Sequence, residues 1–359
     1  MTAAPNVAEP NTATPPETGS PRLPAAGGWY VAARSEELRR APLSRRILGQ
    51  SVVLYRDSRG APVGLEDRCP HKNVALSIGT VRGDRIVCRY HGWSFDPGGR
   101  CVDVPCHSPE EHFPTCTVPR HPAVERDGWI WIWMGEPANP PAPPPAHPMT
   151  PGYRWFELHN LMAAPLDLIL ENGLDCSHTG FAHDGLFRSA PTRFAEARIE
   201  ETPTGIRVET VEPPPERTRD FRSLLSGRRR AVRHVDEIIL PHTLRVDYHL
   251  GAGVHVVTIL VATPEDEWTT RVYTRMGVRY GAITPLMTPV IRWITRRVVA
   301  QDRAVLENQA ATLRAHGGRA FRTVVADQPA TWFQRALRRH REGTFPPAEL
   351  RRRTVRYKL

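Results

Sequence analysis

Two short pairs of metal-ligand residues lie in the first third of the chain. Cys69 and His71 are two residues apart, and Cys88 and His91 are three residues apart. Two cysteines and two histidines suit a tetrahedral zinc ion, but zinc fingers pair like residues, whereas each pair here has one of each type. A [2Fe–2S] cluster with two thiolates on one iron and two imidazoles on the other takes one ligand of each kind from two loops. The spacing therefore favours such a cluster over zinc.

A second group of ligand types lies in the middle of the chain. Asp167, Glu171 and Asp175 recur every four residues, which predicts that they share one face of a helix. His178 follows three residues later and His183 comes after a bend at a glycine. Two histidines and one carboxylate, with open positions opposite them, are the ligands of non-heme Fe(II) oxygenases. Taken alone, the segment is also compatible with an ordinary capped helix that carries hydrogen-bonded histidines.

Both groups resemble motifs of one family. The segments CPHK (69–72) and CRYHGWSFDPGG (88–99) resemble the two cluster loops of a Rieske iron–sulfur domain, and GWIWIW (128–133) resembles its closing strand. The pattern E-N-x-x-D-x-x-H-x-x-x-x-H over 171–183 resembles the mononuclear iron motif of the Rieske non-heme iron oxygenases. The chain is similar to their terminal oxygenase (alpha) subunits, of the single-subunit type of phthalate dioxygenase, vanillate O-demethylase and ketosteroid hydroxylase.

The resemblance implies which residues hold the two iron centres. Cys69, His71, Cys88 and His91 match the cluster ligands, and three residues match the ligands of a mononuclear Fe(II), namely His178, His183 and Asp302. Glu307, five residues after Asp302, lies about 140° further around a helix, so both carboxylates do not easily face one iron.

Three neighbouring residues complete the implied site. Gln301 stands where related sequences often have glutamate. Asn172 and Asp175 belong to the iron motif and are the implied catalytic residues. Asp175 is expected to connect His178 to a cluster histidine, His91 of the partner subunit, because a carboxylate of this kind orients an imidazole.

The run of short elements predicts two domains. Short β-type runs divided by turns at 29–33, 51–55, 85–88 and 129–133 predict a small all-β domain. After a proline-rich stretch, the pattern predicts a strand at 153–160, a helix from Pro165, strands at 206–211, 243–250, 254–262 and 270–278, and a helix at 290–315.

The resemblance gives these domains names. We expect a disordered leader at 1–27, a Rieske [2Fe–2S] domain at 28–136, a proline-rich linker at 137–152, a mononuclear-iron catalytic domain at 153–333, and a basic, peripheral helix and tail at 334–359. The implied fold class is α+β: an all-β Rieske domain followed by an antiparallel-sheet, helix-grip (START-like) catalytic domain.

The implied function is that of an oxygenase component. Such a protein receives electrons, ultimately from NAD(P)H, from a ferredoxin or a flavin reductase, activates O₂, and hydroxylates or O- or N-demethylates an organic substrate. A monooxygenase is favoured, and cis-dihydroxylation is the alternative. Members of this type assemble as homotrimeric rings. A rival of another class is a Rieske electron-transfer protein whose second domain only binds ligands, and a third is a zinc-dependent regulator.

The expected pocket walls are the strands around 240–261 and the helix near 161–170. These segments are rich in Val, Ile, Leu and Met, which predicts an apolar, aromatic or polycyclic ligand. His242, His249 and His255 on these strands either orient a polar substituent or are structural.

The composition excludes several classes of protein. The 359 residues, 40% of them hydrophobic and 24% charged, fit a globular chain of two domains. The net charge of +10 comes almost entirely from arginines whose runs lack interleaved aromatic residues, so nucleic-acid binding is not expected. The apolar stretch 283–299 is broken by prolines and arginines and cannot span a bilayer. Residues 1–27 lack the basic and apolar regions of a signal peptide.

A reducing, cytoplasmic location is therefore expected, where the six cysteines are ligands or core residues. Cys101 and Cys106 are spaced to allow a redox pair, although core packing is the favoured interpretation. Cys116 and Cys176 are expected to be inert.

Overall fold

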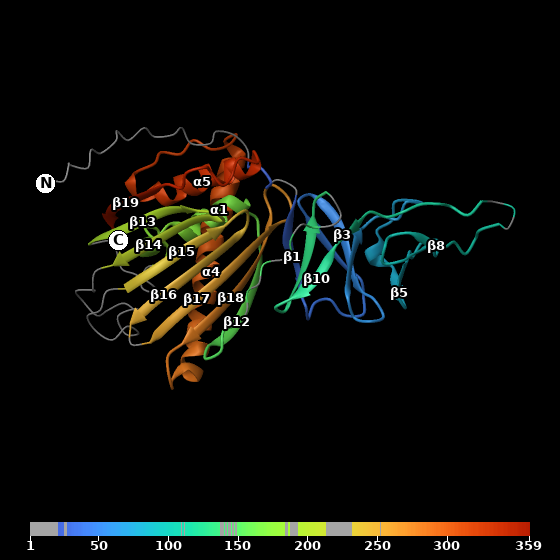
Figure 1. The fold of residues 1–359 in the computed structure, drawn as a ribbon, viewed down its shortest axis with the longest axis horizontal. Helices are drawn as coiled ribbons and strands as arrows, with labels where there is room; N and C mark the ends of the chain where they lie inside the picture. Colours follow the sequence, from blue (N-terminus) through green and yellow to red (C-terminus); the bar gives the residue numbers. More distant parts are fainter. Residues whose placement is uncertain are drawn as a thin grey trace.

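The computed structural model describes residues 21–24, 27–108, 110, 112–136, 140, 142, 145, 147, 149–183, 186, 193–212, 232–251 and 253–359. Most of the expected leader and much of the expected linker lie outside these described residues. The described chain divides into a smaller group of sheets, drawn in blue to teal in Figure 1, and one large sheet with helices, drawn in green to red.

The N-terminal domain is built from three small antiparallel sheets. The first has the order β1 (Gly28–Arg34), β11 (Trp129–Met134), β10 (Ala123–Arg126). The second has the order β2 (Leu43–Ile47), β3 (Gln50–Arg56), β4 (Pro62–Glu66), β9 (Arg120–His121). The third has the order β5 (Thr80–Arg82), β6 (Arg85–Val87), β7 (Ser94–Phe95), β8 (Cys101–Asp103), and the short 3₁₀ helix η1 (Leu76–Ile78) precedes it.

Strand β11 shows how the sequence places this domain. Its residues alternate between tryptophan and isoleucine, and alternate side chains of a strand point to opposite faces. Ile130 and Ile132 pack into the core of the N-terminal domain. Trp129 and Trp131 point the other way and pack against the large sheet. The strand is buried on both faces because it belongs to two cores.

The C-terminal domain is one eight-stranded antiparallel sheet. Its order is β12 (Arg154–Met162), β18 (Thr270–Arg279), β17 (Val254–Pro264), β16 (Thr243–Gly251), β15 (Val232–Ile239), β14 (Gly205–Glu212), β13 (Phe194–Thr202), β19 (Arg352–Lys358). Its helices are α1 (Leu166–Leu174), α2 (Thr179–Ala182), α4 (Thr284–Ala315) and α5 (Gln328–Arg341), with the 3₁₀ helix η2 (Val325–Asp327) before α5. In Figure 1, α1 and α4 lie against the sheet, and α5 lies beside α1.

Helix α4 begins six residues earlier than the sequence predicts. The two prolines at its start explain the difference, because they were read as helix breakers. Pro285 lies in the first turn, where a backbone N–H has no helical partner to lose. Pro289 is inside the helix and removes one hydrogen bond. Among the described residues, no helix has both the length and the apolar composition needed to cross a lipid bilayer.

The arginine-rich end of the chain differs from the expected peripheral helix and tail. Helix α5 starts at Gln328 and buries Phe333, Ala336 and Leu337 in the largest core cluster of the domain. The last residues form strand β19, which pairs with β13 and completes the sheet. The arginines concealed this role because they alternate with Val355 and Tyr357, the two buried side chains of the strand.

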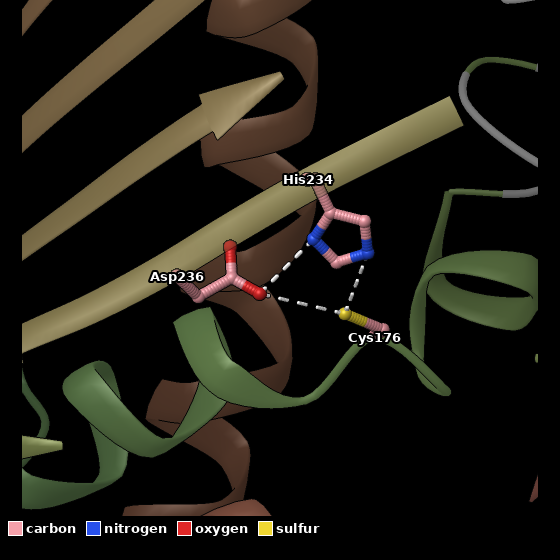
Figure 2. Close-up of side chains that lie close together, drawn as sticks. All are labelled: Cys176, His234 and Asp236. Carbon is pink, nitrogen blue, oxygen red and sulfur yellow. Dashed lines mark hydrogen bonds and ion pairs between the residues drawn. The ribbon is translucent and has the colours of Figure 1, made fainter. Parts of the chain in front are cut away.

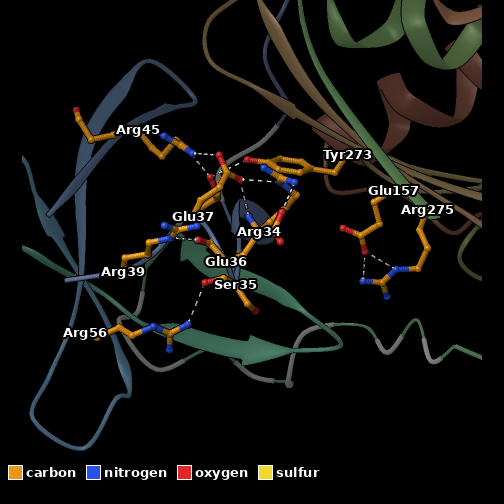
Figure 3. A network of polar contacts seen from close by, with 12 residues as sticks. Arg34, Ser35, Glu36, Glu37, Arg39, Arg45, Arg56, Glu157, Tyr273 and Arg275 are labelled. Carbon is orange, nitrogen blue, oxygen red and sulfur yellow. Dashed lines mark hydrogen bonds and ion pairs between the residues drawn. The ribbon is translucent and has the colours of Figure 1, made fainter. Parts of the chain in front are cut away.

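The two domains share a polar as well as an apolar interface. The Arg275 guanidinium is only 1% exposed, forms an ion pair with Glu157, and lies 4.2 Å from the centroid of the Trp129 ring. Tyr273 donates a hydrogen bond to the Ala32 carbonyl at 2.7 Å. Figure 3 shows Glu157, Tyr273 and Arg275 beside the ion pairs around Glu37 of the N-terminal domain. Because the contacts are buried, they hold the domains in one relative position.

Candidate metal sites

Two loops of the N-terminal domain have the same backbone geometry. In the first, the amide of Cys69 donates to the Val74 carbonyl at 2.8 Å, and the Cys69 carbonyl accepts from Asn73 at 2.9 Å. In the second, the amide of Cys88 donates to the Trp93 carbonyl at 2.8 Å and its carbonyl accepts from the fourth residue on at 3.0 Å. That fourth residue has a positive φ in both loops. The two loops therefore hold their cysteines in equivalent positions, while the histidine is the second residue after Cys69 and the third after Cys88.

The four side chains on these loops lie close together. The Cys69 and Cys88 thiols are buried and form no disulfide bond. Burial raises the pKa of the Cys69 thiol to about 11, and the neighbouring Cys88 adds to this shift. The imidazole rings of His71 and His91 have centroids 4.5 Å apart, and His71 stacks on Trp93. Two adjacent thiols and two adjacent imidazoles fit the donor set of a [2Fe–2S] cluster with mixed ligands.

A second donor group lies in the C-terminal domain, and we name His178, His183 and Asp302 the cavity cluster. Helix α1 ends at Leu174, so Asp175 and His178 do not continue its face, although the spacing predicts this. His178 lies just before the single turn of α2, and His183 lies just after it. Asp302 comes from the middle of α4. The Nε2 atoms of His178 and His183 lie 3.4 Å and 3.1 Å from Asp302 Oδ1.

Two side chains orient the cavity cluster. Gln301 accepts a hydrogen bond through Oε1 from His183 Nδ1 at 3.0 Å, which leaves Nε2 to face Asp302. Asn172 donates through Nδ2 to Asp302 Oδ1 at 3.4 Å and lies 3.5 Å from His178 Nε2. The sequence places Gln301 next to the expected ligand Asp302. In the structure the Gln301 side chain contacts the other ligand, His183, and orients its ring.

The protonation behaviour of the cavity cluster follows from these contacts. Burial alone would raise the pKa of Asp302, but hydrogen bonds from His178 and His183 outweigh burial and lower the pKa to about 2. Burial alone would lower the pKa of His183, but Asp302 raises it. The buried His178 Nδ1 atom has no hydrogen-bond partner among the described residues. A carboxylate and two imidazole nitrogens that converge in this way fit a divalent iron.

Asp175 lies at the edge of the cavity cluster. Its Oδ2 atom is 3.8 Å from His178 Nδ1, and its Oδ1 atom accepts hydrogen bonds from the amide and hydroxyl of Ser177. About a third of the side chain is exposed. One side of this carboxylate is therefore open beside an unpartnered histidine nitrogen.

The cavity cluster opens into a cavity of about 270 Å³. The sequence predicts that segments 240–261 and 161–170 form the walls of this cavity. Both segments line it, through residues that include Leu244, Leu260 and Met162. The walls formed by β18 and α4 were not predicted from the sequence. Their lining residues are Val272, Thr274, Met276, Ile291, Ile294, Thr295, Val298, Val299 and Leu306. In β18 the cavity side chains alternate with Tyr273 and Arg275, which are buried on the opposite face of the strand, so no contrast between apolar and exposed residues marks the cavity face.

Cys176, His234 and Asp236 form a second group of three donors, which we name the buried cluster (Figure 2). His234 Nδ1 donates to Asp236 at 3.1 Å, His234 Nε2 lies 3.6 Å from the Cys176 sulfur, and this sulfur lies 3.8 Å from Asp236. Burial alone would lower the pKa of His234, but Cys176 and Asp236 raise it well above its usual value. Cys176 therefore takes part in a polar network, contrary to the expectation of an inert core residue.

The remaining expected residues have structural contacts. Cys101 lies beside Cys116 and not Cys106: the amide of Cys101 donates to the Cys116 carbonyl at 3.0 Å, and the two thiols interact. His242 contacts the Trp29 carbonyl at 2.7 Å, at the domain interface. His255 contacts Tyr153 at 2.7 Å and stacks on His249. None of these three histidines is among the described residues that line the cavity.

Comparisons with known proteins agree with this architecture. Residues 28–121 match the Rieske [2Fe–2S] domain, and residues 162–343 match the vanillate O-demethylase oxygenase C-terminal domain. The class is thus that of the Rieske non-heme iron oxygenases, whose cofactors are a [2Fe–2S] cluster and a mononuclear iron. Within it, the chain belongs to the family whose catalytic half is the vanillate O-demethylase oxygenase C-terminal domain.

Individual relatives are similar over different lengths. The iron–sulfur subunit of the toluene-4-sulfonate monooxygenase system of Comamonas testosteroni is 36% identical over 49% of this chain, and the match spans about half, 52%, of that relative. The vanillate O-demethylase oxygenase subunit of a Pseudomonas species is 25% identical over 87% of this chain and 93% of its own length. The crystal structure of dicamba monooxygenase bound to dicamba matches 88% of this chain and 97% of its own, with 26% identity and a TM-score of 0.75.

Proposed function

We propose that the protein is the oxygenase component of an electron-transfer system that hydroxylates, or O- or N-demethylates, an apolar small molecule. The observation that carries this proposal is the cavity cluster: two imidazole Nε2 atoms and one carboxylate oxygen that converge on the wall of an apolar cavity. Substrate and O₂ must meet at one metal, and this arrangement provides both the metal ligands and the adjoining space.

We assign the ligands residue by residue. Cys69, His71, Cys88 and His91 hold the [2Fe–2S] cluster, and the cavity cluster holds the mononuclear Fe(II). The paired loops support the first assignment, and the convergence of two Nε2 atoms on Asp302 supports the second. When bound, the two centres supply one-electron transfer and the reduction of O₂.

The chain itself supplies orientation. The Gln301 oxygen holds the proton of His183 on Nδ1, so that Nε2 is the free donor. Asn172 restrains the Asp302 carboxylate and reaches the cavity beside it. Asn172 and Asp175 are the groups assigned to catalysis, because both contact the cavity cluster and also line the cavity.

The cavity favours a neutral substrate, aromatic or polycyclic. The charged groups among its described lining residues are Asp175 and the cavity cluster, and no arginine or lysine is present among them. An anionic substrate would be desolvated there without a cation to stabilise it. The threonines at 258, 274 and 295 provide weak polar contacts on otherwise apolar walls. We therefore favour monooxygenation of an apolar ring system over cis-dihydroxylation of an aromatic acid.

We propose that three copies assemble into a ring. The loops of Cys69 and Cys88 lie by β5 to β8, at the end of the N-terminal domain far from α1 (Figure 1). Within one chain the two metal sites are therefore widely separated, and a neighbouring copy must provide the short electron path. Asp175, with its open side, is the group we place opposite His91 of the partner subunit. A ferredoxin or flavin reductase supplies the electrons in the cytoplasm, ultimately from NAD(P)H.

The first experiment counts iron and acid-labile sulfide per chain in anaerobically purified protein. Three irons to two sulfides are expected, and His183→Ala should lose one iron and keep the cluster absorbance. Product from neutral aromatic or polycyclic compounds, tested with a surrogate ferredoxin and reductase, should disappear in the same variant. A count of two irons per chain that does not increase when Fe(II) is added would instead make the protein an electron carrier. A colourless protein that contains zinc would exclude both the oxygenase and the electron carrier.

The ring is tested separately with Asp175→Ala. This variant should keep all three irons and the trimeric mass while turnover falls by more than about tenfold, because the electron path between subunits is interrupted. Turnover near that of the wild type, or a monomeric wild-type protein that remains active, would contradict the ring.

A further inference from the structure

The outer surface of helix α4 is apolar although it faces solvent. Its first turns project beyond the ends of the strands in Figure 1. Leu286 is 71% exposed, Val290 39% and Trp293 53%, and Ile283, just before the helix, is 54% exposed. Residues three and four apart lie on one side of a helix. We name these four residues the α4 ridge.

Cations accompany the α4 ridge and acids are absent from it. Arg292, Arg296 and Arg297 are exposed on the same turns, and segment 268–301 contains no aspartate or glutamate. The Arg297 guanidinium lies over the Trp293 ring, 5.1 Å from its centroid. Arg292 and Arg296 line a polar groove beside β12, and the acid among its described lining residues, Glu157, is paired with Arg275 instead. The surface therefore combines apolar side chains with uncompensated positive charge.

The opposite face of the same turns borders the cavity. Ile291, Ile294 and Thr295 are buried and line it. A single helix thus separates the apolar cavity from an apolar outer surface.

We propose that the α4 ridge binds the surface of a lipid bilayer that contains anionic lipids. Helices that lie in a membrane interface carry tryptophan and aliphatic residues beside arginines, which pair with anionic headgroups. An acidic protein partner would use the arginines but would leave four large apolar side chains unexplained. A second copy of this chain related by a two-fold axis would bring the same positive charges together without a neutralising acid. Anionic lipid satisfies both features at once.

Vesicle co-sedimentation tests this proposal with the holoprotein and without any turnover. Wild-type protein should bind vesicles of phosphatidylcholine with 30% phosphatidylglycerol and should bind pure phosphatidylcholine much more weakly. Binding should rise steadily with the phosphatidylglycerol fraction and fall in high salt. This series needs no variant, so it stands even if a substitution impairs folding.

Two variants separate the apolar and the charged contributions. Leu286→Glu with Trp293→Glu should abolish binding, whereas Val324→Glu with Val325→Glu, at exposed apolar residues elsewhere, should not. Replacing Arg292, Arg296 and Arg297 by Gln should weaken binding about a hundredfold, since each arginine near an anionic surface contributes about 1 kcal/mol, or roughly fivefold. The cluster absorbance and iron content of every variant report whether it is folded.

Three results would overturn the proposal. Wild-type protein that stays in the supernatant with anionic vesicles excludes it, as does a Glu double variant that binds like the wild type. A double variant whose mass by sedimentation velocity falls below that of the wild type would assign the α4 ridge to a contact between subunits instead. The iron count and product assay are independent of all three results, so failure here leaves the proposed function intact.

Discussion

The cavity cluster and the buried cluster contain similar donors in different surroundings. Each has histidine and aspartate, and in each the ligand atoms lie within 4.8 Å of one another. In the cavity cluster, the Nε2 atoms of both histidines converge on Asp302 Oδ1, and all three residues line an open cavity. In the buried cluster, no residue is more than 6% exposed, and the imidazole, thiol and carboxylate form a closed ring of hydrogen bonds.

The difference shows that donor type and proximity do not define a metal site. A ligand needs a free lone pair and space on its far side, which the cavity cluster has. In the buried cluster, His234 Nδ1 contacts Asp236, and His234 Nε2 contacts Cys176 and Glu212, so neither ring nitrogen faces open space. A second carboxylate, Glu212, lies 3.4 Å from His234 Nε2 and further neutralises the imidazolium. We therefore interpret the buried cluster as structural.

The strongest test of this comparison removes one aspartate from each cluster. Asp302→Ala should lower the iron count from three to two per chain and reduce product formation by more than about a hundredfold, the upper range for groups that only support metal ligands. Asp236→Ala should leave the number of irons per folded chain unchanged. Iron loss in Asp236→Ala with normal iron in Asp302→Ala would reverse the assignment.

The second test concerns stability and uses the histidine of the buried cluster. His234→Ala should lower the free energy of unfolding by about 3–5 kcal/mol, because Asp236 and Glu212 remain buried without their cation. Urea denaturation of the C-terminal domain, followed by circular dichroism, measures the change.

The matched control is a histidine on the adjacent strand. His249→Ala, in β16, should change stability by less than about 1 kcal/mol, because this side chain is partly exposed and forms no ion pair among the described residues. Equal losses in the two variants would show that the buried cluster contributes no special stabilisation.

The sequence predicted the cavity cluster but not the buried cluster. His178 and His183 belong to a spacing pattern within one segment, and Asp302 follows from the resemblance. His234 and Asp236 are far from Cys176 in sequence, and they are joined only because β15 passes beside the end of α1. No local pattern marks such a contact, since it depends on the order of strands in the sheet.

The same distinction applies to the fold. Strands such as β11, β14, β16, β17 and β18 were predicted to within a few residues because their apolar side chains alternate or run together. Strand β19 and helix α5 were misjudged as peripheral, since their arginines outnumber the few buried residues that attach them to the core. Burial on one narrow face is a tertiary property that composition does not reveal.

A third test measures how burial changes the pKa of Glu171, a carboxylate on α1 outside the two clusters. Burial raises the pKa of Glu171 to about 7. The folded protein then binds this proton more tightly than the unfolded chain, so the free energy of unfolding falls as pH rises from about 4.5 to 7. The loss amounts to about 3 kcal/mol at 1.36 kcal/mol per pKa unit. Relative to the wild type, Glu171→Gln should therefore be more stable at pH 8 than at pH 5 by up to this amount.

Denaturation of both proteins at the two pH values measures that difference. Glu307→Gln is the control of opposite sign, because contacts with the Ala163 amide and Arg303 lower the pKa of Glu307 in spite of some desolvation. The stabilising effect of its charge is present above about pH 4.5 and is lost only below that value, so the relative stability of this variant should be nearly the same at pH 5 and pH 8. A Glu171→Gln protein whose relative stability is the same at both values would show that Glu171 is ionised in the folded state.

The smallest expected effect concerns Gln301. The two clusters differ in the type of oxygen that contacts the Nδ1 atom of a histidine. His234 Nδ1 contacts the carboxylate of Asp236, which favours an imidazolium. His183 Nδ1 contacts the neutral amide oxygen of Gln301. Gln301→Leu removes this acceptor and should weaken Fe(II) binding by about ten- to a hundredfold, because the ring loses its orientation. Gln301→Glu retains an acceptor and should bind iron at least as well as the wild type. Chelator competition measures both affinities, and a Leu variant within twofold of the wild type would show that α2 alone positions His183.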